Sequence, residues 1–408
     1  MSRVAITGIG IVSPLGLDAS AYWAGLLAGR SGVDFITEFS TEKLRTDVAA
    51  SVRGFDPLSV LDKREVDYTG RVVQLGLAAS VEAIRQARLE DVDRTRVAVL
   101  VSSGQGSVEI FVEQVEKAGS RGPRAVSPYF IPSSMANAMS GLVATKFGFM
   151  GPSFNVASAC ATSAHSIALG ALLIESGDVD VAVVGGGEAA TCPATIAGFG
   201  NARALARSFE GDPKRASRPY DRKRNGFVIG EGAGALVLES AGHAEKRGAP
   251  PIAWLAGYGM SSDAEHVTRP HPDGAGLRLA IDAALRRAAL APSDIGYLNP
   301  HATSTPAGDV AEYRALGAVF GEGLARIPIS ATKSMIGHLL GGAGAAESIA
   351  CVCSLRDQKL HPSINLDDVD PVFELDLVRE ARVADVRYAL KTSAGFGGHN
   401  CALVFARA

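Results

Sequence analysis

The sequence has little excess charge and no long hydrophobic run. Its 40 Lys and Arg residues face 43 Asp and Glu residues, which leaves a net charge of −3 at pH 7. This balance gives no reason to expect nucleic acid as a partner, because binding to phosphate backbones needs a cationic surplus. No segment approaches the ~18 apolar residues that span a membrane, and glycine and proline interrupt the N-terminus too early for a signal peptide. We therefore expect a cytoplasmic protein that does not bind a membrane.

Cysteine is also scarce, and its spacing argues against several kinds of site. The five cysteines are Cys160, Cys192, Cys351, Cys353 and Cys401. Their odd number and the absence of a C-x-x-C pair argue against zinc ribbons and dithiol redox centres. Gly8 and Gly10 do not begin a dinucleotide fingerprint, because Ser13 stands where the third glycine of G-x-G-x-x-G belongs. The sequence thus predicts no metal ion and no nicotinamide cofactor.

Apolar residues are plentiful, and their pattern is that of an α/β protein. They make up 47% of the 408 residues, which is enough for a large core. Short β-branched runs, for example at residues 4–7 and 97–101, alternate with alanine-rich stretches such as 77–88 and 163–175. The alternation predicts strands separated by helices in a layered fold, with parallel strands buried on both faces.

The two halves of the sequence resemble each other. The matching pairs are residues 4–10 with 252–259, 76–89 with 276–290, 96–104 with 295–303, and 230–238 with 395–405. Self-similarity of this kind indicates duplication, although segments rich in alanine and glycine also match by chance. We expect two related halves, residues 1–250 and 251–408, separated by the break Arg247-Gly-Ala-Pro-Pro251. A site at the seam would draw residues from both halves.

The segment Ser158-Ala-Cys160-Ala-Thr-Ser-Ala-His carries the first candidate for chemistry. We expect it between a short strand at residues 154–157 and a helix from about 161 to 175, which Cys160 would cap. A thiol at a helix start faces unpaired N–H groups, which favour the thiolate that attacks carbonyl carbons. From this segment alone, an ordinary buried cysteine remains an equal alternative.

Three further segments hold candidate residues. His301 lies in residues 299–309, after a predicted strand, and Lys333, His338 and Glu347 follow one another through a glycine-rich turn into a helix. The loop at residues 393–400 is glycine-rich and can present backbone N–H groups to a reacting carbonyl. Taken alone, each histidine is more often structural than catalytic, and the loop is by itself only a turn.

Together these strings resemble the β-ketoacyl-acyl carrier protein synthases, in particular the elongating enzymes of type II fatty acid synthesis and the related discrete polyketide ketosynthases. The resemblance runs from Val4 to Phe405 and includes residues 215–234 and 362–365. It implies the thiolase fold, an α/β architecture in which two duplicated αβα halves form a five-layered core.

The resemblance also implies a reaction and the residues that perform it. Cys160 would carry the acyl chain as a thioester, and His301 and His338 would stabilise the enolate formed when malonyl-carrier loses CO2. The N–H groups of Cys160 and Phe396 would form the oxyanion hole. Lys333 and Glu347 would orient the histidines, or would be simply a buried ion pair. A supporting role is also expected for Asp309.

Binding residues follow from the resemblance as well. Those expected to contact pantetheine are Thr303 and Thr305, and Phe396 would gate the acyl pocket. That pocket would be lined by Gln105, Phe130 and Ala394. The cationic residues expected to contact the acyl carrier protein are Lys63, Arg64, Arg203 and Arg207. The implied assembly is a homodimer or a heterodimer with a chain-length-factor-like homologue.

Two departures from the family pattern bear on the substrate. Gln105 stands where fatty acid enzymes usually have a bulky aliphatic side chain, and Ala394 replaces a usual phenylalanine. A polar group disfavours a saturated alkyl tail unless it finds a partner. Both changes favour a polyketide or polyene chain.

Three alternatives remain. A non-catalytic chain-length factor would lack the nucleophile, and a degradative thiolase would need a second catalytic cysteine in the loop 395–398, where there is none. A zinc site of Cys160, His301 and His338 has suitable donors but lacks the clustered spacing of such sites.

Overall fold

The computed structural model describes residues 4–408, so the start of the predicted half 1–250 lies outside the described residues. A ten-stranded sheet runs in the order β11-β9-β8-β13-β14-β7-β1-β6-β5-β4. Its strands are β1 (Val4–Val12), β4 (Val97–Ser102), β5 (Val181–Glu188), β6 (Gly232–Ser240), β7 (Ala253–Ser262), β8 (Tyr297–Asn299), β9 (Pro328–Ile329), β11 (Asp376–Leu377), β13 (Tyr388–Gly395) and β14 (His399–Arg407). Two short pairs lie apart from it, β2 (Asp34–Phe35) with β3 (Val48–Ala49) and β10 (Lys359–Leu360) with β12 (Arg382–Val383).

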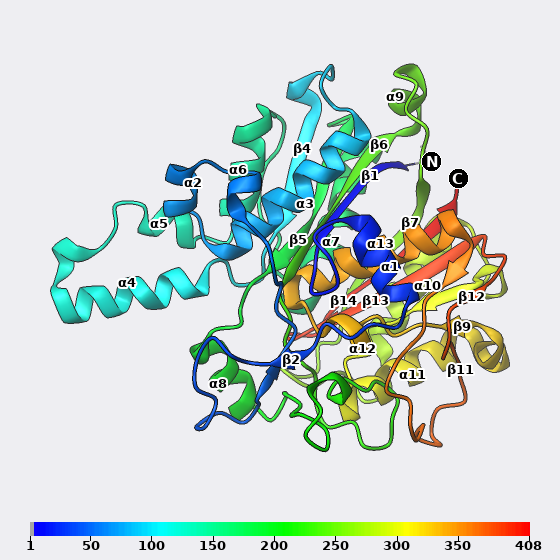
Figure 1. Cartoon of the computed structure of the whole chain (residues 1–408). Helices are drawn as coiled ribbons and strands as arrows, with labels where there is room; N and C mark the ends of the chain where they lie inside the picture. The colour runs from blue at the N-terminus through cyan, green and yellow to red at the C-terminus, as the bar shows by residue number, and fades with distance from the viewer. Residues whose placement is uncertain (1–3) are drawn as a thin grey trace.

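The helices pack against both faces of this sheet (Figure 1). The longer ones are α3 (Arg71–Ala87), α4 (Val108–Arg121), α6 (Ala138–Phe147), α7 (Thr162–Glu175), α10 (Ala275–Ala288), α11 (Pro306–Phe320) and α13 (Ala343–Asp357). The shorter ones are α1 (Ala19–Leu27), α2 (Lys63–Asp67), α5 (Phe130–Ser134), α8 (Pro193–Asn201), α9 (Ala241–Lys246) and α12 (Lys333–Ile336). Among the described residues, no helix is long and apolar enough to cross a bilayer.

The strand order repeats, which confirms the duplication. In the first half, β1 pairs antiparallel with β6, β6 pairs antiparallel with β5, and β5 pairs parallel with β4. In the second half, β7, β14, β13 and β8 follow one another with the same three relations. The two halves join where β1 pairs with β7. The division at residue 250 stays a prediction.

The layers follow from where the helices pack. Helices α7 and α13 contact each other, and both lie between the halves, α7 against β4 and β5 and α13 against β6 and β13. Helix α3 covers the outer face of β1 and β6, and α10 covers β7 and β14. The five-layered core is therefore confirmed, with the two central helices as its middle layer.

Three local predictions were wrong. The strands are buried on both faces as expected, but the sheet is mixed rather than parallel, because continuous apolar runs do not encode strand direction. Residues 154–157 form no strand; the preceding extended segment only touches β4, where the Val99 N–H donates to the Pro152 carbonyl at 2.9 Å. The loop at 393–400 is a hairpin, whose turn is residues 396–398 between β13 and β14.

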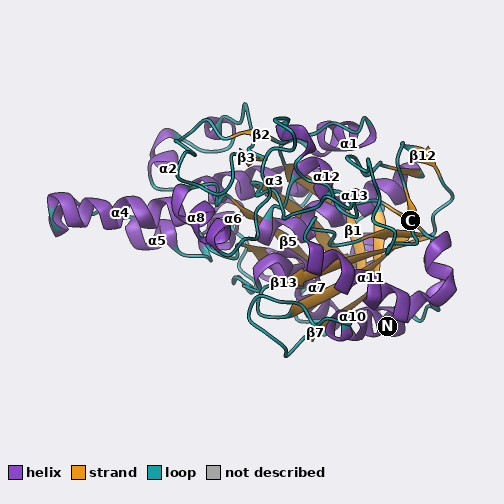
Figure 2. Cartoon of the chain, turned by 90° about the horizontal axis from the view of Figure 1, so that it is seen from below, coloured by secondary structure: helices purple, strands orange, loops and turns teal. Residues whose placement is uncertain are grey.

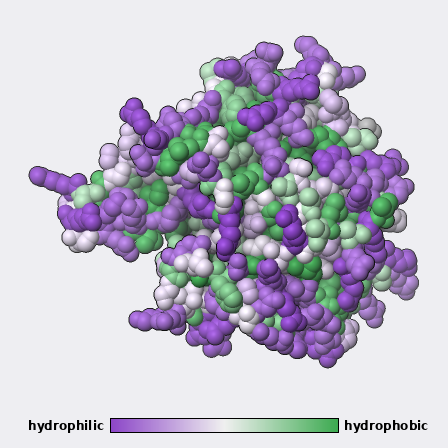
Figure 3. Space-filling view, in the orientation of Figure 1, coloured by the Kyte–Doolittle hydropathy of each residue, from purple (hydrophilic) through white to green (hydrophobic). Residues whose placement is uncertain are grey.

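An arm made of α4 and α5 extends from the body in two perpendicular views (Figures 1 and 2). It carries exposed apolar side chains, and Figure 3 shows hydrophobic atoms there among hydrophilic ones. The residues are Phe111, Val115, Tyr129, Ile131 and Met135. Such a concentration of apolar surface is typical of a face that contacts a protein partner.

Candidate active site

A strained turn positions the thiol. Cys160 lies in a 3-10 turn, Ala159–Ala161, directly before α7, whose N-cap is Ala161. Ala159 adopts φ 50°, a left-handed conformation that non-glycine residues seldom occupy. Two contacts hold the turn: the Ser158 N–H donates to Thr162 Oγ1 at 3.0 Å, and Ser158 Oγ lies 2.7 Å from His165 Nδ1. The cysteine therefore precedes the helix, as expected, although it is not the cap itself.

The fold brings the cysteine and both candidate histidines together. Cys160 Sγ and one ring nitrogen each of His301 and His338 all lie within 4.8 Å of one another. The two imidazole rings are nearly perpendicular, at 84°, with centroids 5.2 Å apart. Cys160 comes from the first half and the histidines from the second, so the site lies at the seam. These residues line a cavity of about 370 Å³.

His338 is oriented by backbone contacts. The backbone N–H of His338 donates to the Val228 carbonyl at 2.7 Å, and the ring Nδ1 accepts the backbone N–H of Leu340 at 3.3 Å. Since Nδ1 accepts, the proton of the neutral ring belongs on Nε2. That Nε2 is buried and has no hydrogen-bond partner among the described residues. His338 therefore holds a free N–H donor beside the thiol.

His301 is fixed from two sides. Its backbone N–H and that of Ala302 donate to the two carboxylate oxygens of Glu312, both at 2.7 Å. On the other side, Lys333 Nζ donates to the His301 carbonyl at 2.6 Å and lies 3.3 Å from its Nδ1. An ammonium group beside Nδ1 leaves Nε2 as the protonated nitrogen. The imidazole of His301 is thus a second N–H donor.

Lys333 and Glu347 contact each other, as the sequence suggested, within a larger charge network. Glu347 also contacts Lys391, whose Nζ lies 3.0 Å from Glu347 Oε2. Lys391 is on β13 and is fully buried, with its Nζ also against Ser393 Oγ. Neither Lys391 nor Glu312 was predicted from the sequence. The signal for Lys391 was a lysine inside the apolar run of a buried strand.

Glu188 is another buried carboxylate near the site that was not predicted from the sequence. It ends β5 and accepts hydrogen bonds from Ser103 Oγ at 2.6 Å, the Gly104 N–H at 3.1 Å and the Gly341 N–H at 3.2 Å. It therefore ties the loop after β4 to the turn that follows His338. Burial raises the pKa of Glu188 to about 7.

The electrostatics correct the expectation of a thiolate. Burial raises the pKa of the Cys160 thiol to about 11, although Lys333 and a hydrogen bond from the Phe396 N–H act to lower it. The cost of desolvating a thiolate therefore exceeds the help from the helix start. Burial, followed by the charge of Lys333, sets the pKa of both His301 and His338 well below the usual value. The resting site is a neutral thiol beside two neutral imidazoles.

The Phe396 N–H donates to the Cys160 sulfur, which puts it where an oxyanion hole needs a donor. This position depends on Gly395, because a Cβ there would lie 2.6 Å from the Ser158 carbonyl oxygen. The Phe396 ring is partly exposed and lies 6.2 Å from the ring of Phe199. The backbone donor is therefore placed as expected, and the gating role of the Phe396 side chain stays a prediction.

The expected binding residues divide into those on the cavity and those away from it. The cavity wall includes Thr303, Thr305, Arg203 and Ala394, with the two threonine oxygens 2.9 Å apart. Away from the wall are Lys63 and Arg64, exposed on α2, and Arg207, exposed and bonded to the Arg45 carbonyl. Gln105 is exposed after β4, and the Phe130 ring packs on Phe111 of the arm. Within the described chain, neither Gln105 nor Phe130 lines the cavity.

Asp309 lies apart from the thiol, in the first turn of α11. Its carboxylate accepts the Ser304 N–H at 3.1 Å and the Tyr220 N–H at 3.2 Å, and burial raises its pKa to about 7. It therefore holds the loop that carries Thr303 and Thr305. Asp309 thus contacts this loop and not the reacting atoms, and its supporting role stays a prediction.

Two related α/β halves that bring a thiol and two imidazoles to one cavity define a condensing enzyme of the thiolase-like class. Comparison with known families agrees. Residues 1–244 match the model of the beta-ketoacyl synthase N-terminal domain, and residues 252–367 match that of the C-terminal domain. The chain belongs to the β-ketoacyl synthase family and is an acyltransferase.

Individual relatives cover the whole chain. The 3-oxoacyl-(acyl-carrier-protein) synthase 2 of Vibrio cholerae is 42% identical over 410 residues, with 99% of each chain covered. The ishigamide ketosynthase/chain length factor structure superposes with a TM-score of 0.93 at 34% identity, covering 100% of this chain and 99% of that one. A type II polyketide synthase ketosynthase, bound to the hexaketide and in complex with its acyl carrier protein, has a TM-score of 0.92 at 31% identity and full coverage of both chains.

Proposed function

We propose that the protein is a 3-oxoacyl-(acyl-carrier-protein) synthase, which extends an acyl chain held on Cys160 by condensing it with malonyl-carrier. The observation that carries this proposal is the convergence of the Cys160 sulfur and the two imidazoles within 4.8 Å, in a cavity that spans both halves. Both imidazoles are neutral, as N–H donors to an enolate oxygen must be.

In the first step, the thiol of Cys160 attacks the thioester carbonyl of the acyl-carrier. The thiol proton passes to the leaving pantetheine sulfur, so that no net charge is created in the buried site. The N–H groups of Cys160 and Phe396 stabilise the oxyanion. Losing one such donor typically slows a reaction by a factor of about 10² to 10³.

In the second step, malonyl-carrier loses CO2 and leaves an enolate at the thioester. The Nε2–H groups of His301 and His338 donate to the enolate oxygen, which requires neutral imidazoles with a free N–H. The nucleophilic carbon then attacks the acyl carbonyl on Cys160 and displaces the thiolate, which takes up one proton. The products are CO2, the free thiol and a 3-oxoacyl-carrier two carbons longer.

The partners follow from the same reaction. An acyl carrier protein delivers both substrates; Thr303 and Thr305 bind its pantetheine, and Arg203 at the cavity supports contact with an acidic carrier. Pairing with a second copy or with a chain-length-factor-like homologue would cover the apolar arm. The reaction involves no oxidation or reduction, and the cations Lys333 and Lys391 disfavour a metal ion beside the thiol, so we propose no cofactor.

We further propose a polyketide or polyene chain as the substrate rather than a saturated fatty acyl chain. Ala394 leaves room in the cavity wall, and polyketide ketosynthases are among the similar structures.

The thiolase alternative needs a second reactive cysteine, but Cys401 is fully buried on β14, and burial raises the pKa of its thiol to about 12.

The test is condensation by purified protein with malonyl-carrier and a panel of acyl primers, followed by intact mass of the carrier. Cys160→Ala should abolish the 3-oxoacyl product while the chain stays folded. Cys192→Ala removes a partly exposed cysteine outside the cavity and should leave the product unchanged. Condensation retained by the Cys160 variant would refute the assignment.

A further inference from the structure

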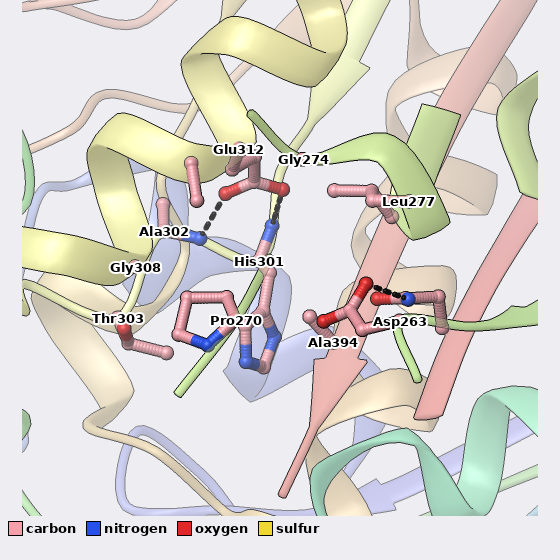
Figure 4. Close-up of a pocket in the computed structure, with 12 residues that line it drawn as sticks. Asp263, Pro270, Gly274, Leu277, His301, Ala302, Thr303, Gly308, Glu312 and Ala394 are labelled. Atoms are coloured by element: carbon pink, nitrogen blue, oxygen red, sulfur yellow. Dashed lines mark hydrogen bonds between the residues drawn. The ribbon is translucent and has the colours of Figure 1, made fainter. Parts of the chain in front are cut away.

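A second, smaller cavity lies beside His301 (Figure 4). Its volume is about 40 Å³, and His301, Thr303 and Ala394 line both this side cavity and the main one. Other residues belong to the side cavity alone, among them Leu277 of α10 and Ala311 of α11. The side cavity therefore adjoins the main cavity at these three residues.

The wall of the side cavity favours an apolar occupant. Most of its lining consists of small or apolar residues, including Leu277, Ala311 and Ala394. Its carboxylates are engaged, since Glu312 accepts two backbone N–H groups and Asp263 Oδ1 accepts from Asn400 Nδ2 at 2.7 Å. A polar occupant would lose its bonds to water and gain few in return.

The size of the side cavity limits the occupant to a short group. In the same measure of volume, one water molecule needs about 10–15 Å³. About 40 Å³ therefore suits a methyl or ethyl group and excludes an extended acyl chain.

The position of the side cavity indicates that its occupant belongs to the extender, that is, to the malonyl-type group that supplies the new carbons. The carbon that loses CO2 must lie within reach of both the acyl group on Cys160 and the N–H of His301, and His301 lines the side cavity as well as the main one. We propose that the side cavity receives an α-alkyl substituent of the extender, so that the enzyme accepts 2-methylmalonyl-carrier besides malonyl-carrier. This inference rests on the proposed function.

The chemistry of a substituted extender balances in the same way. The C–C bond to the carboxylate breaks and releases CO2, and the same carbon forms the bond to the acyl carbonyl on Cys160. The displaced thiolate takes up one proton. The methyl group stays on that carbon throughout, so the product is a 2-methyl-3-oxoacyl-carrier.

The test compares malonyl-carrier with 2-methylmalonyl-carrier, using one primer and intact-mass detection. The wild-type protein should elongate with both. Ala311→Val adds volume to a wall of the side cavity that does not line the main cavity. It should lower kcat/KM for 2-methylmalonyl-carrier by a factor of about 10 to 200, which is the usual discrimination that one methyl group produces in a pocket. With malonyl-carrier, the same variant should change less than twofold. Leu277→Ala enlarges the side cavity and should raise the relative use of 2-ethylmalonyl-carrier.

Each other outcome decides against the proposal. If wild-type protein condenses malonyl-carrier but forms no methyl-branched product, the side cavity holds no substituent. If Ala311→Val slows both extenders equally, the cavity serves the movement of the Phe396 gate or the stability of the site. Failure with malonyl-carrier itself would instead overturn the proposed function, so the two failures are distinguishable.

Discussion

Replacing Glu347 by Gln should destabilise the protein far more than removing one of its lysine partners. Glu347 is fully buried and contacts both Lys333 and Lys391, which are themselves buried. Glu347→Gln leaves two ammonium groups without their carboxylate, and breaking a buried ion pair from one side costs about 3–5 kcal/mol. Lys391→Met leaves Lys333 to neutralise Glu347 and puts an apolar chain of similar length on the strand. We expect this variant to lose about 1 kcal/mol, within the usual range for point changes.

The free energy of unfolding can be measured by urea titration of the three proteins with linear extrapolation. Glu245→Gln is a matched control, because Glu245 is exposed on α9, and it should behave as wild type. Stability of Glu347→Gln within about 1 kcal/mol of wild type, or a larger loss for Lys391→Met, would refute the reasoning that one buried carboxylate neutralises two lysines.

Three further predictions concern the reaction. Because burial holds the pKa of His301 and His338 well below the usual value, both stay neutral above pH 6.5, and the NMR signals of their imidazole rings should not shift between pH 6.5 and 8. A shift that follows a group titrating near 6.5 would contradict this. Gly395→Ala should lower kcat for condensation about 10²-fold or more, because the added Cβ would displace the cysteine turn and the Phe396 N–H. Gly242→Ala is the control: a Cβ at Gly242 meets open space, so this variant should leave kcat unchanged. Thr303→Val should raise KM for malonyl-carrier more than it lowers kcat, and an unchanged KM would remove Thr303 from the pantetheine site.

Much of the site could be predicted from the sequence, because its residues lie in long and specific sequence motifs. Cys160, His301 and His338 were proposed from such motifs, and the structure brings them together. The partnership of Lys333 with Glu347 and the duplication of the halves were also visible, since each depends on patterns within short segments. The glycine-rich segment at residues 393–400 indicated backbone donors, and the Phe396 N–H is one.

What only the tertiary structure decided depends on groups that are distant in sequence. Strand direction was open because a buried apolar run reads the same in either direction. The pKa of the Cys160 thiol is set by burial under both halves, which outweighs the local effect of the helix start. The place of Glu312 on α11 and the side cavity next to Ala394 likewise result from packing between β13, α10 and α11. Lys391 on β13 and the exposed Gln105 after β4 also take their surroundings from the folded chain. A sequence specifies which groups are available. Desolvation and charge act through space, so only the folded chain fixes the protonation states of these groups and the volume of the cavities around them.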